Sequence, residues 1–442
     1  MKRIIKFLLV CSTVLGVGGM GILVGCSALP DLTLPLRPTA TPPPIPMSPT
    51  PSPTATPVTA LTPTPGPVTL DLWVPDFLNP YDEGPVAAVL NEQLATFTAT
   101  HSDIQVRVTM KKDTGPGGLY DLLSTAAGVA PAVVPDLIVL NQHDLRAAAT
   151  EGLLQPMDDY LTADAGYFDP VLDAVRVSEA FWAFPYVARA NQMAYREDIT
   201  TTAPLSWTAV LTPGHRLLLP TTPTDGLGGD TLLAIYMGSG GRVLDTGGQA
   251  TLERAHLERV YGFFWDLQQA GLLDADRVLA LSTLSACWDS YQEGYADLIP
   301  VPIARFWLEP LEDALPSWAP TEDGAPITVV HTWGLAITTQ EPVRRDAALT
   351  LARWLVAGQQ MADLTRAAQL VPTHVQAVDR WSLLPEGSTF LKALLSAGVP
   401  ALPPAVDAPV RRALQAGLTV LLQQDVDSPA AAASYALTVL RR

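Results

Sequence analysis

The sequence is poor in cysteine, with three in 442 residues: Cys11, Cys26 and Cys287. The first two lie in or directly after an apolar N-terminal segment, which leaves Cys287 alone in the rest of the chain. A single cysteine cannot form an intramolecular disulfide, so we expect a fold that is stable through its hydrophobic core. About 375 residues follow the N-terminal part, which is enough for two domains of usual size.

Basic residues are also scarce, with 27 Lys and Arg against 44 Asp and Glu and a net charge of −17. Without Lys2, Arg3 and Lys6, which precede the apolar segment, 24 basic residues face 44 acidic ones and the charge is −20. Such a surface repels the phosphates of nucleic acids and acidic lipid head groups. Nucleic acid binding is therefore excluded as a main role. Hydrophobic residues at 48% with 16% charged residues indicate a well-buried globular protein.

Motifs of catalysis are missing. The chain has neither the G-x-S-x-G motif of hydrolases nor the G-x-x-x-x-G-K phosphate loop. Two glycine-rich stretches, "DTGPGGLYD" and "TDGLGGD", lack the lysine and are predicted to be loops that lead into helices. The six histidines do not stand at the spacing of a metal pair, although folding could bring some together: His101, His143, His215, His256, His331 and His374. We expect no enzyme, no cofactor and no metal site.

Residues 1–25 have the features of an export signal. Three basic residues are followed by a stretch from Phe7 to Gly25 without any charge, which ends in small residues. In "ILVGC", Leu23 stands three places before Cys26, and this resembles the lipobox of bacterial lipoproteins. The resemblance implies that Cys26 is acylated, becomes the new N-terminus and anchors the protein on the extracellular face of the cell membrane. The alternatives are a plain cleaved signal and an uncleaved helix, since the apolar run is nearly long enough to span a membrane.

Residues 26–67 are predicted to form a tether. Residues 30–67 hold 14 of the 41 prolines and nine threonines, as in "PTATPPPIPMSPTPSPTATP". This composition cannot pack a core and favours extended polyproline II. At roughly 3.1 Å per residue the stretch would reach about 120 Å, as a stalk would. An ordinary linker of no special function is the alternative.

Beyond residue 67 the hydrophobic pattern switches between the strand and helix periods. Residues 68–74 and 104–111 alternate as strands do, residues 84–101 have helical spacing, and "PDLIVL" is apolar throughout, as is typical of a strand buried on both faces. This order predicts a parallel sheet with helices on both sides. A second such unit starts near residue 190, with "RLLLP" and "YADLIPV" as strands, and closing helices follow at the C-terminus.

Five blocks carry a resemblance to a known family: "PDLIVLNQHDLRAAATEGLLQPMDDYL", "FWAFPYVARANQMAYREDI", "IYMGSGGRVLD", "YQEGYADLIPV", and "HTWGLAIT" followed by a helix and "QLVPTH". In order and spacing they resemble the sugar-binding family of extracellular solute-binding lipoproteins of ABC transporters, over nearly all of residues 68–442. Two stretches depart from the family pattern. "APLSWTAVLTPGHR" is shortened, and residues 310–326 are proline-rich without a clear counterpart.

The resemblance implies an α/β fold of the two-lobed type II periplasmic-binding-protein kind, with each lobe a mostly parallel sheet flanked by helices and a ligand cleft between the lobes. Residues 68–187 and 329–372 are expected to form lobe 1, and residues 188–328 and 373–442 lobe 2. The implied function is capture of a small solute, with a carbohydrate favoured, by a monomer that delivers it to an ABC permease. The alternative is a surface sensing or interaction protein that uses the fold without transport, and a hydrolase is more distant.

Ligands of open α/β sheets bind beyond the carboxyl ends of the strands. This rule and the family positions select ten candidate ligand-binding residues: Asp76, Phe77, Asn141, Gln142, Tyr186, Arg189, Trp288, Trp307, His331 and Trp333. Structural alternatives exist for several of them, because Trp333 and Trp288 could be core residues, Arg189 could form a salt bridge, and Asn141 could cap a helix. The crossings near residues 186–190 and 328–333 are expected to act as hinges.

Overall fold

The computed structural model describes residues 66–442, apart from residues 213, 222, 224, 225, 310, 312 and 382. The expected export signal, Cys26 and nearly all of the expected tether lie outside the described residues. The described residues belong to one compact unit. Within this part of the chain, no helix has the length and apolar character needed to cross a membrane.

The first lobe contains a mixed sheet. Its strands are β1 (Val68–Pro75), β2 (Ile104–Lys111), β3 (Leu137–Asn141), β6 (Phe184–Arg189), β10 (Val329–Ile337), β11 (Val371–Pro372) and β12 (Val399–Pro400). They lie in the order β11-β6-β10-β3-β1-β2, and β12 pairs with β10. A separate hairpin joins β4 (Arg176–Val177) and β5 (Ala180–Phe181).

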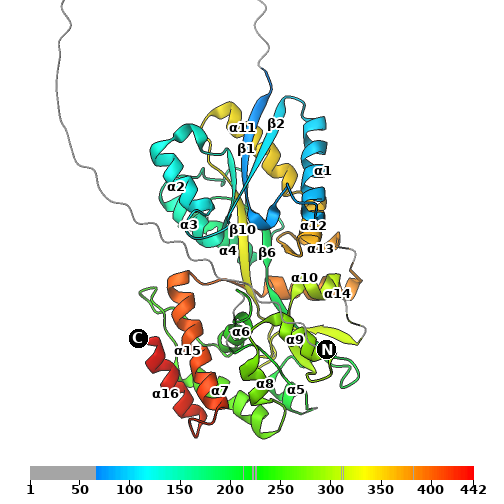
Figure 1. Ribbon diagram of the computed structural model, residues 1–442, viewed down its shortest axis with the longest axis vertical. Coiled ribbons are helices and arrows are strands. Elements are labelled where there is room, and N and C mark those ends of the chain that lie inside the picture. Colours follow the sequence, from blue (N-terminus) through cyan, green and yellow to red (C-terminus); the bar gives the residue numbers. More distant parts are fainter. Residues whose placement is uncertain are drawn as a thin grey trace, which may run out of the picture. The chain divides into compact units, whose positions relative to one another are not determined.

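Strand direction in this sheet differs from the expected mostly parallel arrangement. β1 runs parallel to β2 and β3, as predicted from the βαβ pattern. β10 runs antiparallel to both β3 and β6, and β11 runs antiparallel to β6. The reason is visible in Figure 1, where β6 leads from the upper lobe toward the lower one and β10 lies beside it in the opposite direction, on its way back.

Helices cover the first sheet, which is why every residue of β3 is buried. Figure 1 shows α1 and α12 on one side of the sheet and α2 and α3 on the other. The helices are α1 (Pro85–Thr100), α2 (Leu119–Val129), α3 (Gln142–Thr150), α4 (Asp169–Val175), α11 (Pro342–Leu355), α12 (Gly358–Ala367), α13 (Val375–Asp379) and α14 (Pro385–Ser396), with 3-10 turns at Asp76–Leu78 and Pro131–Val133.

The second lobe has a small antiparallel sheet instead of the expected parallel one. Its strands β7 (Asn191–Arg196), β8 (Leu298–Pro302) and β9 (Ala314–Ser317) lie in the order β8-β7-β9. The segment 216–220, expected as a strand, forms a single parallel bridge from Leu217 to Leu298. The helices are α5 (Trp207–Leu211), α6 (Asp230–Gly238), α7 (Arg254–Gln269), α8 (Ala275–Ala280), α9 (Leu284–Gln292), α10 (Ile303–Leu308), α15 (Pro404–Leu422) and α16 (Pro429–Leu440).

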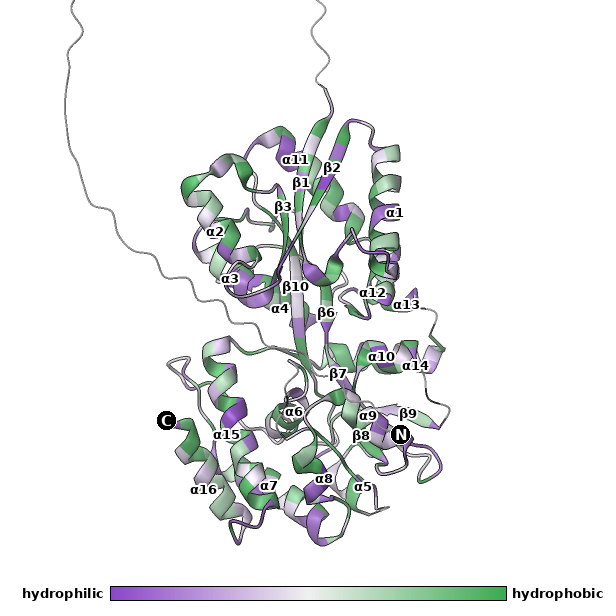
Figure 2. Ribbon diagram, viewed as in Figure 1, coloured by the Kyte–Doolittle hydropathy of each residue, from purple (hydrophilic) through white to green (hydrophobic). Residues whose placement is uncertain are grey.

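Two hydrophobic cores define the lobes. Ala190 packs in the first core and Met193 in the second, and the neighbours Val329 and Val330 of β10 are divided in the same way. Figure 2 shows the mixture of apolar and polar residues along α7 and α15 that is typical of helices with one buried face. The first core also includes residues as far as Leu395, beyond the expected boundary at 372, because α13 and α14 pack on the first lobe. The third crossing then follows α14, near β12.

Candidate functional site

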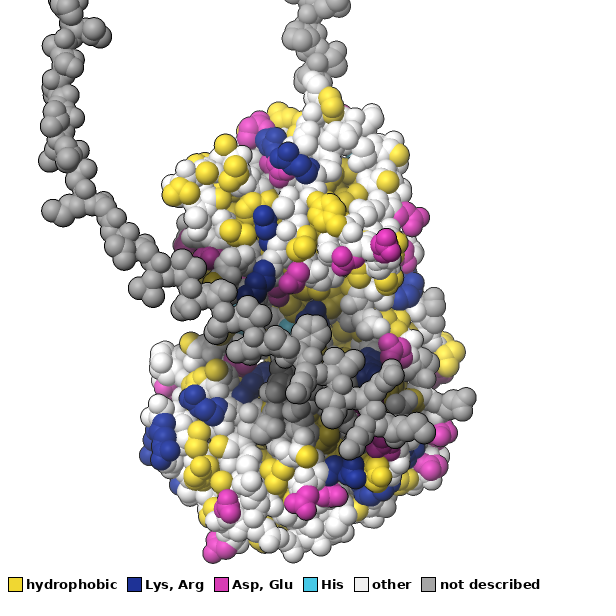
Figure 3. All heavy atoms as spheres, in the orientation of Figure 1, with side chains coloured by type: hydrophobic (Ala, Val, Ile, Leu, Met, Phe, Trp, Pro, Cys, Tyr) yellow, Lys and Arg dark blue, Asp and Glu magenta, His cyan; other side chains and the backbone are white. Residues whose placement is uncertain are grey.

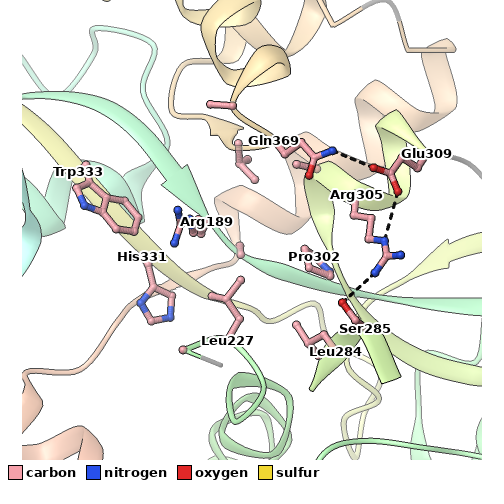
Figure 4. A pocket seen from close by; sticks show the side chains of 15 residues that line it. Arg189, Leu227, Leu284, Ser285, Pro302, Arg305, Glu309, His331, Trp333 and Gln369 are labelled. Carbon is pink, nitrogen blue, oxygen red and sulfur yellow. Dashed lines mark hydrogen bonds and ion pairs between the residues drawn. The ribbon is translucent and has the colours of Figure 1, made fainter. Parts of the chain in front are cut away.

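A pocket of about 780 Å³ lies where the crossings meet, and both lobes line it. Figure 4 shows Arg189, His331 and Trp333 on the strands of the crossing, opposite a group formed by Arg305, Glu309 and Gln369. The lining residues are Arg189, Ala190, Gly226, Leu227, Leu284, Ser285, Pro302, Ala304, Arg305, Glu309, His331, Trp333, Ala368, Gln369 and Val371. The pocket thus joins polar side chains with apolar ones.

Trp333 is fixed in its position by β10 and by a hydrogen bond from its indole. The pairing of β10 with β6 shifts register between Trp333 and Gly334, an irregularity that redirects side chains locally. The indole Nε1 donates to Asp113 Oδ1 at 2.9 Å, and Trp333 is only 6% exposed. Burial raises the pKa of Asp113, while the hydrogen bond from Trp333 and the charge of Arg189 oppose the rise. Trp333 is therefore both a core residue and a residue of the pocket wall.

Arg189, the last residue of β6, lies against two aromatic rings. Its Cζ is 4.9 Å from the ring centroid of Phe77 and 5.1 Å from that of Trp333. The two rings meet edge to face, with centroids 5.2 Å apart and an interplanar angle of 77°. Burial lowers the pKa of Arg189, and the charges of Asp113 and Asp76 act against this. The rings hold the guanidinium in place through cation–π contacts and leave its N–H groups available.

His331, two residues before Trp333, is held from the side of the second lobe. Its Nε2 is 3.0 Å from Asp230 Oδ2, at the first position of α6. The other oxygen of Asp230 accepts a hydrogen bond from Arg411 Nη2 at 2.6 Å. Burial lowers the pKa of Arg411, but the carboxylates of Asp230 and Asp407 more than offset this and raise it. This buried ionic group connects β10 to α6 and α15.

The opposite wall is a chain of hydrogen bonds. Arg305 on α10 donates to Ser285 Oγ at 3.2 Å and pairs with Glu309 Oε2 at 3.4 Å. Gln369 Nε2 donates to the other oxygen of Glu309 at 2.9 Å and so links this group to the first lobe. Gln369 has a positive φ of 51°, which is uncommon for a residue other than glycine. Such backbone strain is concentrated at functional sites.

Three of the ten predicted site residues line the pocket, Arg189, His331 and Trp333. A fourth, Phe77, packs against Trp333 and Arg189 without lining the pocket. Asp76 is exposed beside them and acts on Arg189 by its charge.

The other five predicted residues have structural roles. Asn141 caps α3 by accepting from the backbone N–H groups of His143 and Asp144. Gln142 is buried, donates to the Ala401 carbonyl and accepts from the Thr332 N–H, so both ends of its amide are used.

The three remaining aromatic candidates pack inside the lobes. Tyr186 is 2% exposed in the first core, and Trp288 is 3% exposed in the second core. Trp307 packs against both cores and donates to Gln192 Oε1 at 2.9 Å. None of the three lines the pocket as described.

Several residues of the site were not predicted. Asp113 and Leu227 belong to the two glycine-rich stretches that the sequence indicated only as loops, and Asp230 ends the second of them. Arg305 and Glu309 follow β8, where the strand-end rule applied, but that rule selected Trp307 on the same helix. The end of β8 was the correct signal for this part of the site. The rule selected Trp307, however, which lies about half a helical turn away from both Arg305 and Glu309.

The described residues contain no group of three side chains suited to hold a metal ion. On the face shown in Figure 3, acidic and basic side chains are scattered over both lobes and form no single charged patch.

A comparison with known proteins shows the family of this chain. Residues 92–383 match the family model described as bacterial extracellular solute-binding protein. No curated protein matches the chain. Among solved structures, the chain is similar to maltose-bound MalE3 of T. maritima, at 18% identity and a TM-score of 0.60, over 85% of this chain and 99% of that one.

Two further structures give the same result. The cyclic alpha-maltosyl-1,6-maltose binding protein of Arthrobacter globiformis shares 16% identity at a TM-score of 0.66. The extracellular solute-binding protein family 1 of Alicyclobacillus acidocaldarius shares 14% at 0.67. Each covers 85% of this chain and 98% of its own. These similarities confirm the predicted two-lobed fold, and the family match makes the chain a member of the bacterial extracellular solute-binding proteins.

Proposed function

We propose that the protein binds a carbohydrate in the pocket between its lobes and delivers it to an ABC importer. The observation that carries this proposal is the pocket itself, which both lobes line at their crossings. Its volume of about 780 Å³ lies within the range usual for small-molecule sites. Polar groups such as Arg189 and Gln369 supply directed hydrogen bonds, while Leu227, Leu284 and Trp333 supply apolar surface.

The named ligands of similar structures support the class of solute. The relatives from T. maritima and Thermus thermophilus are described as bound with maltose and maltotriose, and that of Thermotoga lettingae with alpha-D-tagatose. Family membership favours solute transport over sensing without transport. We infer that the described part of the chain works as a monomer, because one pocket already contains groups from both lobes.

A thermal-shift screen against neutral and acidic mono- and oligosaccharides tests the proposal. A ligand that binds only the folded protein stabilises it by about 2.7 kcal/mol at one hundred times its dissociation constant. Peptides and polyamines serve as controls of other chemistry. Stabilisation by peptides or polyamines, with no carbohydrate that raises the melting temperature, would contradict the carbohydrate assignment.

We further propose that Cys26 is lipidated and anchors the protein on the extracellular face of the membrane, with residues up to 67 as a tether. The support is the lipobox-like "ILVGC" after an uncharged apolar segment. Cys26→Ser should abolish lipid labelling and leave the precursor uncleaved. Cys287→Ser, at a buried cysteine of the second core, is the matched control and should remain lipid-labelled. Lipid labelling of the Cys26 variant would contradict the anchor.

A further inference from the structure

The charged group of the pocket wall that remains available to a ligand is a donor, the guanidinium of Arg189. Among the described residues, no hydrogen bond or ion pair engages the Arg189 guanidinium, whose contacts are the faces of Phe77 and Trp333. A planar guanidinium presents its donors in a fork that fits the two oxygens of an acid group. Because burial opposes its charge, Arg189 is a cation that a partner of opposite charge would stabilise.

The carboxylates and the serine hydroxyl around the pocket already have partners. One oxygen of Glu309 accepts from Gln369 and the other pairs with Arg305. Ser285 Oγ accepts from Arg305. Asp230 is directed to His331 and Arg411. Among the described charged side chains that line the pocket, Arg189 is thus the one that no hydrogen bond or ion pair engages, and it calls for an acceptor on the ligand.

The carboxylates near Arg189 do not accept hydrogen bonds from its guanidinium. Asp113 and Asp76 act on it through their charges, but neither forms an ion pair with it and neither lines the pocket. Asp113 is engaged by the indole of Trp333 instead. Of the charged side chains that line the pocket, two are arginines and one is Glu309, in a protein whose net charge is −17.

We propose that the bound solute is an anionic carbohydrate, a sugar whose carboxylate or phosphate group binds Arg189. This inference rests on the proposed carbohydrate function and narrows it. The acid group would contact the crossing strands β6 and β10, and the sugar ring would extend toward Arg305 and Gln369. Charge-assisted bonds to a guanidinium are about twice as strong as bonds between neutral groups. The acid group would therefore dominate the choice of ligand.

The test is calorimetric titration of the wild-type protein with matched acidic and neutral sugars. The acidic ligands are galacturonate, digalacturonate and glucose 6-phosphate. They show whether the protein binds a carboxylate or a phosphate more tightly. The neutral arms are galactose, glucose and the methyl ester of galacturonate, which keeps the shape and removes the charge. An acidic sugar is expected to bind about 10- to 100-fold more tightly than its neutral counterpart.

Variants at one position assign the effect to Arg189. Arg189→Gln should lose about 10- to 100-fold in affinity for the acidic sugar and little for a neutral one. Arg189→Lys keeps the charge without the fork and should lie between the two. Arg412→Gln removes the same charge at an exposed position of α15 and should bind as the wild type does. Melting curves of each variant show whether it is folded.

The outcomes separate the two proposals. Neutral sugars that bind as tightly as acidic ones, or an Arg189→Gln variant with unchanged affinity for the acidic sugar, overturn the anionic ligand and leave the carbohydrate function in place. Failure of every sugar in the titrations and in the thermal-shift screen overturns both.

Discussion

At the scale of single residues, Trp333 combines two roles that a single substitution should reveal together. The residue is 6% exposed within the first core, yet it lines the pocket and its ring supports Arg189. Trp333→Ala should therefore lower the free energy of unfolding by about 3–5 kcal/mol, as a core cavity does. It should also weaken ligand binding by about 1–3 kcal/mol. Circular dichroism melts and calorimetric titration measure the two losses.

Phe264→Ala is the control for this prediction. Phe264 is fully buried in the second core and does not line the pocket. Its truncation should cost stability with unchanged affinity. If Trp333→Ala behaves in the same way, Trp333 is a core residue and leaves the proposed site.

His143 should make the stability depend on pH. Burial, together with the charges of His331 and Arg146, lowers the pKa of His143 to about 4. In the unfolded chain the pKa of histidine is near 6.5, so between these values the unfolded state binds a proton that the native state does not. The stability contributed by neutral His143 is present above about pH 6.5 and is lost as the pH falls toward 4.

A variant separates the contribution of His143 from that of other groups. One of these is His215, because burial lowers its pKa as well. Urea unfolding of His143→Gln should show a smaller loss of stability between about pH 6.5 and 4 than the wild type. The difference in slope is at most about 1.4 kcal/mol per pH unit, the value for one proton. Equal slopes for the two proteins would exclude His143 as the source.

At the scale of elements, β10 depends on a glycine that other side chains crowd. A Cβ at Gly334 would lie 2.7 Å from Ala183 Cβ and 2.7 Å from Leu145 Cδ1. Gly334→Ala should therefore cost about 1–3 kcal/mol in the free energy of unfolding through overpacking. Gly262 in α7 has no atom within 4 Å of such a Cβ, and Gly262→Ala should stabilise by up to about 1 kcal/mol. Denaturant unfolding of both variants tests the pair, and a neutral Gly334→Ala contradicts the predicted clash.

The elements themselves were largely predictable, but the directions of the strands were not. β1 alternates and β3 is apolar from Leu137 to Leu140, and these patterns identify strands. Periodicity is the same in parallel and antiparallel strands, so it could not indicate that β10 enters the sheet against β3. The segment around Leu217 is as apolar as a strand, yet it makes only one bridge because its partners come from other parts of the second lobe.

Site residues at the ends of strands could be predicted from the sequence, whereas site residues in loops could not. Arg189 ends β6 and reaches the pocket, whereas Tyr186, three residues earlier on the same strand, is buried in the first core. Asp113 meets Trp333 across 220 residues of sequence, a distance over which no local pattern carries information. Gln369 stands out by its positive φ, a backbone conformation that only the folded chain shows.

At the scale of the whole molecule, the pocket connects ligand binding to the relation of the lobes. A ligand shifts a conformational equilibrium only by binding one state more tightly than the other. A solute that contacts Arg189 and Arg305 together would favour the state in which both walls are close. Small-angle X-ray scattering of the described part of the chain should show a smaller radius of gyration at saturating ligand than without it. Unchanged scattering at saturation would mean that binding requires no closure.

The order of the strands also constrains when the first lobe is able to fold as the chain emerges. β10 is hydrogen-bonded between β3 and β6, yet residues 190–328 separate it from β6 along the chain. A polypeptide that emerges from its N-terminus therefore presents β3 and β6 long before the strand that joins them, and such distant pairings form slowly. The sheet of the first lobe is completed only after residues 190–328, which belong to the second lobe, have emerged. A nascent chain that stops before residue 329 should thus remain open to proteases at β3 and β6.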